Sequence, residues 1–173
     1  MKMVTFIHKL VNCDFAALCA VYAQSLESDR ARDYPLLDAR EGALLAEQAF
    51  YQYLSQVFFR TPGAVLAAFC VEKQYICALR LEPYKDGYLI SGLETAQAYR
   101  RKGFGLQLVN AALAYCANRG VGKVYAHIHR KNKASEKLHL SAGFALLVDG
   151  ATLLDGAYSS QYTTYCYTNQ GDK

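Results

Sequence analysis

The sequence has 173 residues and a mass of 19.2 kDa, which fits one domain over residues 1–173. Hydrophobic residues make up 53% and charged residues 20%, which excludes a disordered chain, and no apolar run reaches the ~18 residues of a membrane helix. The N-terminal residues do not have the pattern of a secretory signal. The cysteines at positions 13, 19, 70, 77, 116 and 166 form no CxxC and no zinc-type cluster. We therefore expect reduced thiols, a cytoplasmic protein and no metal site.

The net charge of +4 is unevenly distributed along the chain. Residues 1–99 contain nine Lys and Arg against eleven Asp and Glu, whereas residues 100–173 contain ten against four. This asymmetry indicates a polyanion site in the second half, for nucleic acid or for a phosphorylated cofactor. A solvated basic surface is the alternative.

The first half of the chain predicts a strand, two helices that begin at aspartate caps, and a pair of strands joined by a hairpin turn. Between the helices we expect a polar break, and turns at Pro62 and Pro83. The predicted elements are a strand at Val4–Leu10, a helix from Asp14 to Leu26, a break at Ser28–Pro35, a helix from Asp38 to Phe59, and strands at Ala64–Val71 and Tyr75–Leu81.

The second half predicts strands that alternate with helices. These elements are a turn at residues 83–87, strands at Tyr88–Thr95, Lys123–His129, Ala145–Val148 and Tyr162–Thr168, and helices at Gly105–Asn118 and Ser135–Ser141. The order indicates a single α/β (α+β) domain, with a central mixed sheet of about six to seven strands flanked by about four helices.

The turn after the predicted strand Tyr88–Thr95 contains Arg100-Arg101-Lys102-Gly103-Phe104-Gly105. The N–H groups at the start of a helix lack intrahelical partners and attract anions, and glycine lets a phosphate approach the backbone closely. The segment is neither a P-loop nor a complete GxGxxG motif. It predicts a pyrophosphate site, with a basic glycine turn as the alternative.

This segment resembles the acetyl-CoA-binding motif [QR]-x-x-G-x-[GA] of the GNAT superfamily of N-acetyltransferases. The preceding Leu93, Thr95, Tyr99 and Arg100 are similar to the usual lead-in of the motif, with Thr95 where Val is common and Gln97 where Pro is common. A second family-like element follows, in which His139 stands at the position of the usual tyrosine. It comprises Asn132, Ser135, Leu138, Gly143 and Phe144.

The resemblance covers about residues 88–145 and implies acetyl-CoA as co-substrate. It implies that the pantetheine arm lies between two diverging strands and that N–H groups of residues 101–106 hold the pyrophosphate. The cofactor-binding residues that it implies are Leu93, Glu94, Thr95, Arg100, Arg101, Lys102, Gly103, Phe104, Gly105, Leu106 and Asn132.

The resemblance also implies direct transfer of an acetyl group from acetyl-CoA to an amine. The family's tyrosine protonates the leaving thiolate, and His139 could replace it because imidazole also donates protons. Glu94 and His127 are the candidate bases that would take the amine proton, with Glu94 ahead. Strand alternation places Glu94 on the face opposite Leu93 and Thr95, so a bulge would decide its direction.

A second hypothesis is a GNAT-like module that binds acyl-CoA with little or no transfer, which the replacement of tyrosine by His139 favours. A nucleic-acid partner ranks low, because the phosphates of CoA explain the basic charge and no nucleic-acid-binding motif is present. We expect no membrane partner. A homodimer is common in such folds, although the sequence carries no separate signal for one.

Overall fold

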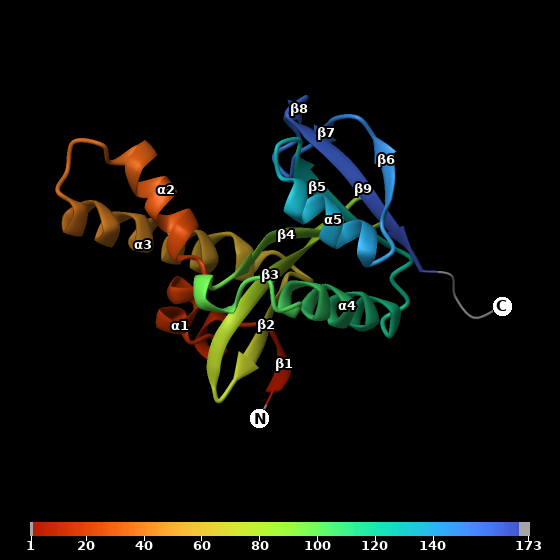
Figure 1. The fold of residues 1–173 in the computed structure, drawn as a ribbon, viewed down its shortest axis with the longest axis horizontal. Coiled ribbons are helices and arrows are strands. Elements are labelled where there is room, and N and C mark those ends of the chain that lie inside the picture. Colours follow the sequence, from red (N-terminus) through yellow and green to blue (C-terminus); the bar gives the residue numbers. More distant parts are fainter. Residues whose placement is uncertain (1, 170–173) are drawn as a thin grey trace.

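The computed structural model describes residues 2–169 and contains a seven-stranded sheet in the order β1-β2-β3-β4-β5-β9-β6. Helices cover both faces of this sheet (Figure 1). The strands are β1 (Lys2–Ile7), β2 (Val65–Val71), β3 (Gln74–Tyr84), β4 (Gly87–Thr95), β5 (Lys123–His129), β6 (Ala145–Val148), β7 (Ala151–Thr152), β8 (Tyr158–Ser159) and β9 (Tyr162–Thr168). The helices are α1 (Phe15–Val21), α2 (Ala23–Asp33), α3 (Ala39–Gln56), α4 (Phe104–Ala117) and α5 (Lys133–Ser141). The predicted α/β fold class is confirmed.

Strand β2 divides the core into two layers because both of its faces are covered. Val65, Ala67 and Phe69 lie in the cluster that includes α4, whereas Leu66 and Ala68 lie in the cluster that includes α1, α2 and α3. Burial on both faces explains why the β2 sequence is a continuous apolar run without polar alternation.

The two aspartates predicted to cap helices do so. Asp14 Oδ1 accepts a hydrogen bond from the Ala17 N–H at 3.0 Å, and Asp38 Oδ1 accepts from Arg40 and Glu41 N–H groups, both at 2.9 Å. Each cap satisfies N–H groups that the first helical turn leaves without partners.

The prediction of one helix to Leu26 followed by a break at Ser28–Pro35 is wrong. The helix is interrupted at Tyr22, and α2 continues through the polar residues to Asp33. Leu26 is the only buried residue that α2 contributes, so no apolar periodicity marks this helix. Ion pairs between residues three apart, Glu27–Arg30 and Asp29–Arg32, stabilise it instead.

The predicted turn at residues 83–87 begins too early, because β3 continues through Pro83 to Tyr84. The pairing of β2 with β3 ends at Leu81, so Pro83 lies where β3 has β4 alone as a neighbour and its missing N–H disrupts no ladder.

Smaller boundary differences occur elsewhere. β1 ends at Ile7, before the predicted Leu10, and α3 ends at Gln56, followed by a 3₁₀ turn at Phe58–Arg60. The two-residue strands β7 and β8 were not predicted, because strands this short carry no periodic pattern.

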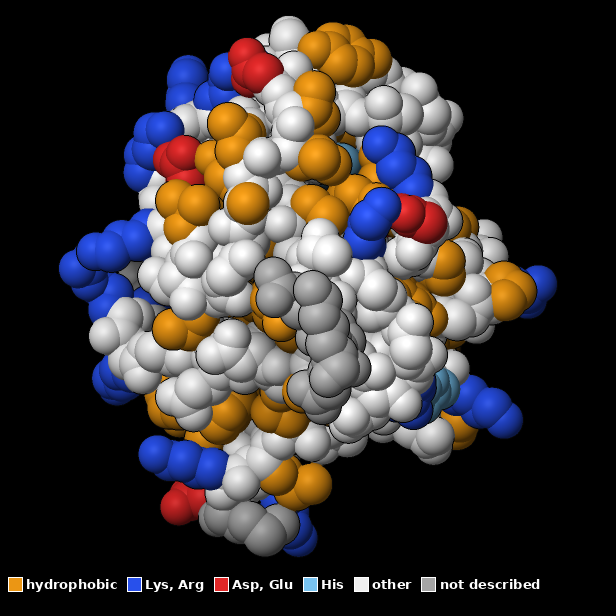
Figure 2. Space-filling model, turned by 90° about the vertical axis from the view of Figure 1, so that its right-hand side faces the viewer, with side chains coloured by type: hydrophobic (Ala, Val, Ile, Leu, Met, Phe, Trp, Pro, Cys, Tyr) orange, Lys and Arg blue, Asp and Glu red, His pale blue; other side chains and the backbone are white. Residues whose placement is uncertain are grey.

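Strand β6 forms one edge of the sheet and exposes Leu146, Leu147 and Val148. The face away from the α2–α3 hairpin carries several separate groups of apolar side chains with Lys and Arg around them (Figure 2). Within residues 2–169, the structure has no helix with the length and apolar character that crossing a membrane requires.

The two-layer core predicts that the same Leu→Ala change lowers the free energy of unfolding far more at a buried site than at an exposed one. Leu66 is 0% exposed on β2, whereas Leu36 is 96% exposed before α3. Leu66→Ala should lower the free energy of unfolding by about 2–5 kcal/mol because it leaves a cavity, and Leu36→Ala by less than about 0.5 kcal/mol. Urea unfolding measures both; equal losses would contradict this description of the core.

Candidate active site

Strands β4 and β5 separate after a short parallel segment. Their pairing comprises Tyr88, Leu89 and Ile90 of β4 with Val124, Tyr125 and Ala126 of β5. Beyond this segment, the described residues show no further pairing between the two strands, and β5 pairs onward with β9 alone. The β5-facing edge of β4 after Ile90 therefore keeps backbone N–H and C=O groups available to a ligand.

A β-bulge lies in β4 at the point of separation. Ala78 pairs with Glu94 and Arg80 pairs with Ser91, so two β4 residues lie opposite Leu79 alone. Gly92 occupies the bulge with φ +55°, a conformation that residues with a Cβ adopt rarely. The bulge changes the alternation of β4 and determines where Glu94 points.

The space between the diverging strands is a cleft of about 560 Å³, here named the central cleft. It brings together all three predicted catalytic residues, Glu94, His127 and His139. Its further lining includes Leu93, Arg100 and Asn132 from the predicted cofactor-binding set.

The N-terminus of α4 is free of side-chain capping. Gly103 precedes the helix with φ +79°, and no side chain accepts a hydrogen bond from its first turn. The Gly103 carbonyl oxygen accepts from the Gln107 N–H at 3.1 Å, so regular backbone hydrogen bonding of the helix begins with the Gln107 N–H. The N–H groups of Phe104, Gly105 and Leu106 thus remain available, together with the positive end of the helix dipole.

Three exposed basic residues precede this helix. Arg100 Nε donates to the Thr95 carbonyl oxygen and Lys102 Nζ donates to the Ala98 carbonyl oxygen, each at 2.9 Å. Arg101 adopts a left-handed conformation with φ +60°. The turn therefore combines positive charge with backbone N–H groups, an arrangement suited to a diphosphate.

Two predicted cofactor residues direct their side chains elsewhere. The Thr95 hydroxyl donates to Cys77 Sγ at 3.2 Å, and the buried Phe104 ring packs against Phe69 with centroids 5.2 Å apart. At these positions only the backbone is available to a ligand. The predicted contacts of these residues are thereby restricted to backbone groups.

Glu94 lies between the central cleft and a second cavity. This side cavity, of about 490 Å³, lies between the α2–α3 hairpin and the sheet, and Ser25, Gly92 and Glu94 line both spaces. The Ser25 hydroxyl donates a hydrogen bond to the Glu94 carboxylate. Burial raises the pKa of Glu94 above its ordinary value of 4.5, which makes the carboxylate a stronger base.

His139 is buried in α5, with 3% of its surface exposed. Its Nδ1–H donates to the Ser135 carbonyl oxygen at 2.8 Å, which leaves Nε2 unprotonated in the neutral ring. This Nε2 has no partner among the described residues. Burial lowers the pKa of His139 below 6.5.

His127 on β5 has the same tautomer for a different reason. The Thr164 hydroxyl donates its one proton to the Gly150 carbonyl oxygen at 2.7 Å, so at 3.0 Å it must accept from His127 Nδ1–H. His127 Nε2 also lacks a partner within residues 2–169, and burial lowers the pKa of the ring. The cleft is thus lined by one carboxylate and by two histidines whose Nε2 atoms are unprotonated in the neutral rings and buried without a partner among the described residues.

Asn132 has a structural role that the sequence did not indicate: its Oδ1 accepts from the Ser135 N–H at 3.0 Å and caps α5. Its amide nitrogen can still donate into the cleft.

Sequence reasoning missed Ser25 and Arg80, which line the side cavity, because each lies in an element without a motif. The six cysteines are free thiols. In residues 2–169 no cluster of three His, Cys, Asp or Glu residues could hold a metal.

Solved structures with the same fold are acetyltransferases. The PaiA N-acetyltransferase from Thermoplasma acidophilum, solved with coenzyme A, has a TM-score of 0.63 at 11% identity, over 96% of this chain and 99% of that one. The ribosomal-protein-S18-alanine N-acetyltransferase from Escherichia coli has a TM-score of 0.61 at 15% identity, over 100% of this chain and 99% of that one. At such identities the likeness establishes the fold alone.

The sequence matches the model of the acetyltransferase (GNAT) family over residues 23–144. The chain belongs to this family. A curated relative, the chloroplastic GCN5-related N-acetyltransferase 6 of Arabidopsis thaliana, is 29% identical over 96 residues, which are 54% of this chain. The match spans 33% of the length of that relative.

The buried imidazole of His139 predicts a pH-dependent stability. Its folded pKa is below 6.5, so the unfolded chain binds more protons as the pH falls through that value, and the folded state loses stability. His139→Asn keeps a donor near Nδ1 and removes the titration. The difference in unfolding free energy between wild type and variant should shrink as the pH falls from about 8 to about 5. Urea unfolding across this range measures it, and a constant difference would contradict the prediction.

Proposed function

We propose that this protein is an N-acetyltransferase that moves an acetyl group from acetyl-CoA directly to an amine. The observation that carries the proposal is the central cleft, which has an unpaired strand edge along one side, an uncapped helix N-terminus near it and a half-buried carboxylate at its junction with the side cavity. The CoA bound to the Thermoplasma relative supports the same cofactor here.

The residues present fit acetyl-CoA. The free edge of β4 matches the amides of the pantetheine arm, and the Phe104, Gly105 and Leu106 N–H groups match the diphosphate. His139 lines the same cleft, and its buried Nε2 has no partner among the described residues. When bound, acetyl-CoA supplies a thioester whose carbon–sulfur bond breaks as the acceptor nitrogen forms a carbon–nitrogen bond.

Glu94 is the base in this proposal. An alkyl ammonium with a pKa of ~10.4 must lose a proton to become nucleophilic, and a carboxylate of raised pKa accepts it more readily than an ordinary one. Glu94 lies between the two spaces, so an amine that enters from the side cavity reaches the carboxylate as it reaches the thioester. The Ser25 hydroxyl orients the carboxylate.

His139 returns a proton to the leaving sulfur. Only its imidazolium form carries a proton on Nε2, because Nδ1–H is committed to Ser135. Burial makes this imidazolium a minor species but a stronger acid than an exposed one. The leaving thiolate, whose thiol has a pKa of ~8.5 by analogy with cysteine, accepts its proton.

Glu94→Gln should lower kcat by about 10²- to 10⁴-fold, the usual contribution of a general base, while acetyl-CoA binding is retained. Glu72→Gln, in the β2–β3 turn, is the matched control and should keep the wild-type rate. Release of free thiol with a panel of primary amines measures turnover. If kcat of Glu94→Gln stayed within about threefold of wild type, the base would be another group. A loss of kcat of about 10²- to 10⁴-fold in His127→Asn would then identify His127 as that base.

Gly103→Asp should weaken acetyl-CoA binding at least about tenfold, because it places a carboxylate beside the diphosphate and a side chain at φ +79°. Gly120→Asp is the matched control, since Gly120 has φ +71°, has nothing within 4 Å of an added Cβ and lies beyond the other end of α4.

Thermal unfolding with acetyl-CoA measures this binding, with ATP as a control ligand. A ligand at 100 times its dissociation constant stabilises the fold by ~2.7 kcal/mol, or several degrees. Wild type and Gly120→Asp should show the shift, and Gly103→Asp should not. A full shift in Gly103→Asp would overturn this placement of the diphosphate. A shift without turnover of any amine would favour a binding module instead.

A further inference from the structure

Arg80, on β3, lines the side cavity, and its guanidinium forms a long ion pair with Glu82. Its side chain is 18% exposed, and its Nε is buried with no partner among the described residues. The Glu82 carboxylate lies 3.6 Å from Nε, beyond hydrogen-bond distance. A guanidinium this buried ordinarily has its donors satisfied.

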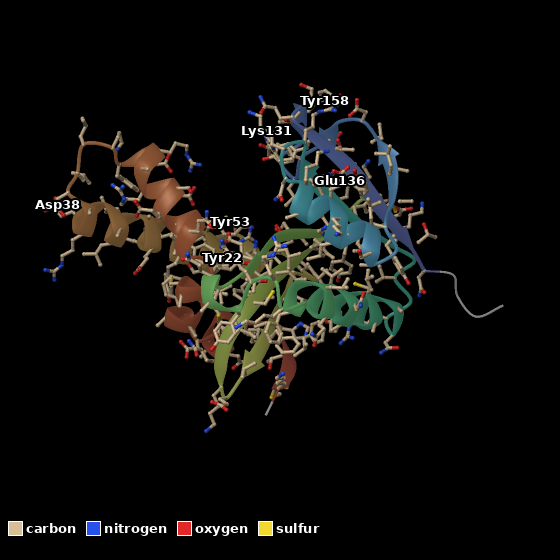
Figure 3. All side chains as sticks on the ribbon, in the orientation of Figure 1. Tyr22, Asp38, Tyr53, Lys131, Glu136 and Tyr158 are labelled. Carbon is tan, nitrogen blue, oxygen red and sulfur yellow. The ribbon has the colours of Figure 1, made fainter. Side chains whose placement is uncertain are left out.

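Two tyrosine rings hold this guanidinium in place. Arg80 Cζ lies 5.9 Å from the ring centroid of Tyr22 and 5.3 Å from that of Tyr53. Both tyrosines lie where the α2–α3 hairpin meets the sheet, whereas Asp38 lies at the far end of the hairpin (Figure 3). The Tyr22 hydroxyl donates to the Gly92 carbonyl oxygen at 2.5 Å and the Tyr53 hydroxyl donates to Glu82 at 3.2 Å. These hydrogen bonds orient the two rings, and the rings in turn position the Arg80 guanidinium.

The bulge in β4 makes room for the guanidinium. A Cβ on Gly92 would lie 2.9 Å from Arg80 Cζ and Nη2, so the fork occupies the space that a side chain would take. Glu82 is already engaged by Ser91 and Tyr53 hydroxyls. The guanidinium therefore lines the cavity with its Nε unpartnered among the described residues, and Glu82, which also accepts from two hydroxyls, balances its charge at 3.6 Å.

The rest of the side cavity has an apolar wall, and a carboxylate lies where the cavity meets the central cleft. Leu26, Ala46 and Phe50 contribute to the wall, and Glu94 lies at the junction with the central cleft. Arg32 also borders the cavity, but Asp29 and Asp33 bind its guanidinium. Among the described residues that line this cavity, Arg80 is thus the cation whose guanidinium has no hydrogen-bonded carboxylate.

We propose that the acceptor carries a carboxylate that binds Arg80, so that the substrates are free amino acids with apolar side chains. This inference rests on the proposed acetyl transfer. The planar guanidinium matches a carboxylate in a bidentate pair, the α-amine then faces Glu94, and the apolar side chain contacts the wall around Phe50. Arg80 is a specificity-determining residue and takes no part in proton transfer.

Three amines of one scaffold test the carboxylate requirement: L-phenylalanine, L-phenylalaninamide and 2-phenylethylamine. L-leucine, L-leucinamide and 3-methylbutylamine form a second series. For wild type, kcat/KM should be about 10- to 100-fold higher for the carboxylate member of a series, because hydrogen bonds to charged groups discriminate by this amount. Arg80→Met should abolish the preference, and Arg80→Lys should retain part of it because the charge stays while the fork is lost.

Arg119→Met is the matched control. Arg119 also stacks on a tyrosine, with Cζ 3.6 Å from the Tyr115 ring centroid, but it follows α4 and does not line the side cavity. This variant should keep the preference for carboxylates. Circular dichroism of each variant checks folding, and Arg80→Lys keeps the test decisive if Arg80→Met does not fold.

A binding measurement without acetyl-CoA separates this inference from the proposed transfer. N-acetyl-L-phenylalanine should raise the thermal midpoint of wild type, its amide should not, and Arg80→Lys should reduce the shift. Uncharged amines acetylated as well as amino acids would overturn the carboxylate requirement and leave the transferase intact. If no amine were acetylated, the transferase would fail, while an Arg80-dependent shift with N-acetyl-L-phenylalanine would still support the carboxylate site. Equal shifts with the acid and its amide would overturn it.

Discussion

The divergence of β4 from β5 is the constraint on which the rest of the site depends. Two parallel strands that stay paired satisfy each other's backbone, but here pairing ends at Ile90 and the bulge at Gly92 follows directly. Free backbone groups in a protein interior are costly unless a ligand or water satisfies them. The fold therefore maintains a cleft with polar backbone edges at the centre of its sheet.

The bulge links the two spaces of the site. It sets the direction of Glu94, its glycine admits the guanidinium of Arg80, and its carbonyl oxygen accepts from Tyr22. One inserted residue thus positions the Glu94 carboxylate and the Arg80 guanidinium relative to each other, and it links the α2–α3 hairpin to the sheet. Such insertions in strands commonly re-aim side chains beside functional sites.

The two histidines of the central cleft, buried His139 and half-buried His127, show how tautomers follow from neighbouring acceptors. The Ser135 carbonyl oxygen and the Thr164 hydroxyl oxygen each accept a hydrogen bond from an Nδ1–H, which leaves both Nε2 atoms unprotonated in the neutral rings. Burial then favours the neutral rings. The same burial that lowers these pKa values raises that of Glu94, so the cleft brings a stronger acid and a stronger base together.

The sequence alone determined what depends on local patterns. Apolar periodicity predicted the order of strands and helices, and Asp14 and Asp38 marked helix starts. The glycines after Arg100 marked the start of α4, where an anion site stays a prediction. The sequence could not predict α2, which ion pairs stabilise without an apolar stripe, nor a β3 that continues through Pro83. Only the tertiary structure brought Ser25, Arg80 and Glu94 to one cavity, because they come from separate elements and meet through strand pairing and a bulge. A sequence specifies local geometry residue by residue, whereas contacts between distant elements follow from packing and register, which no local pattern encodes.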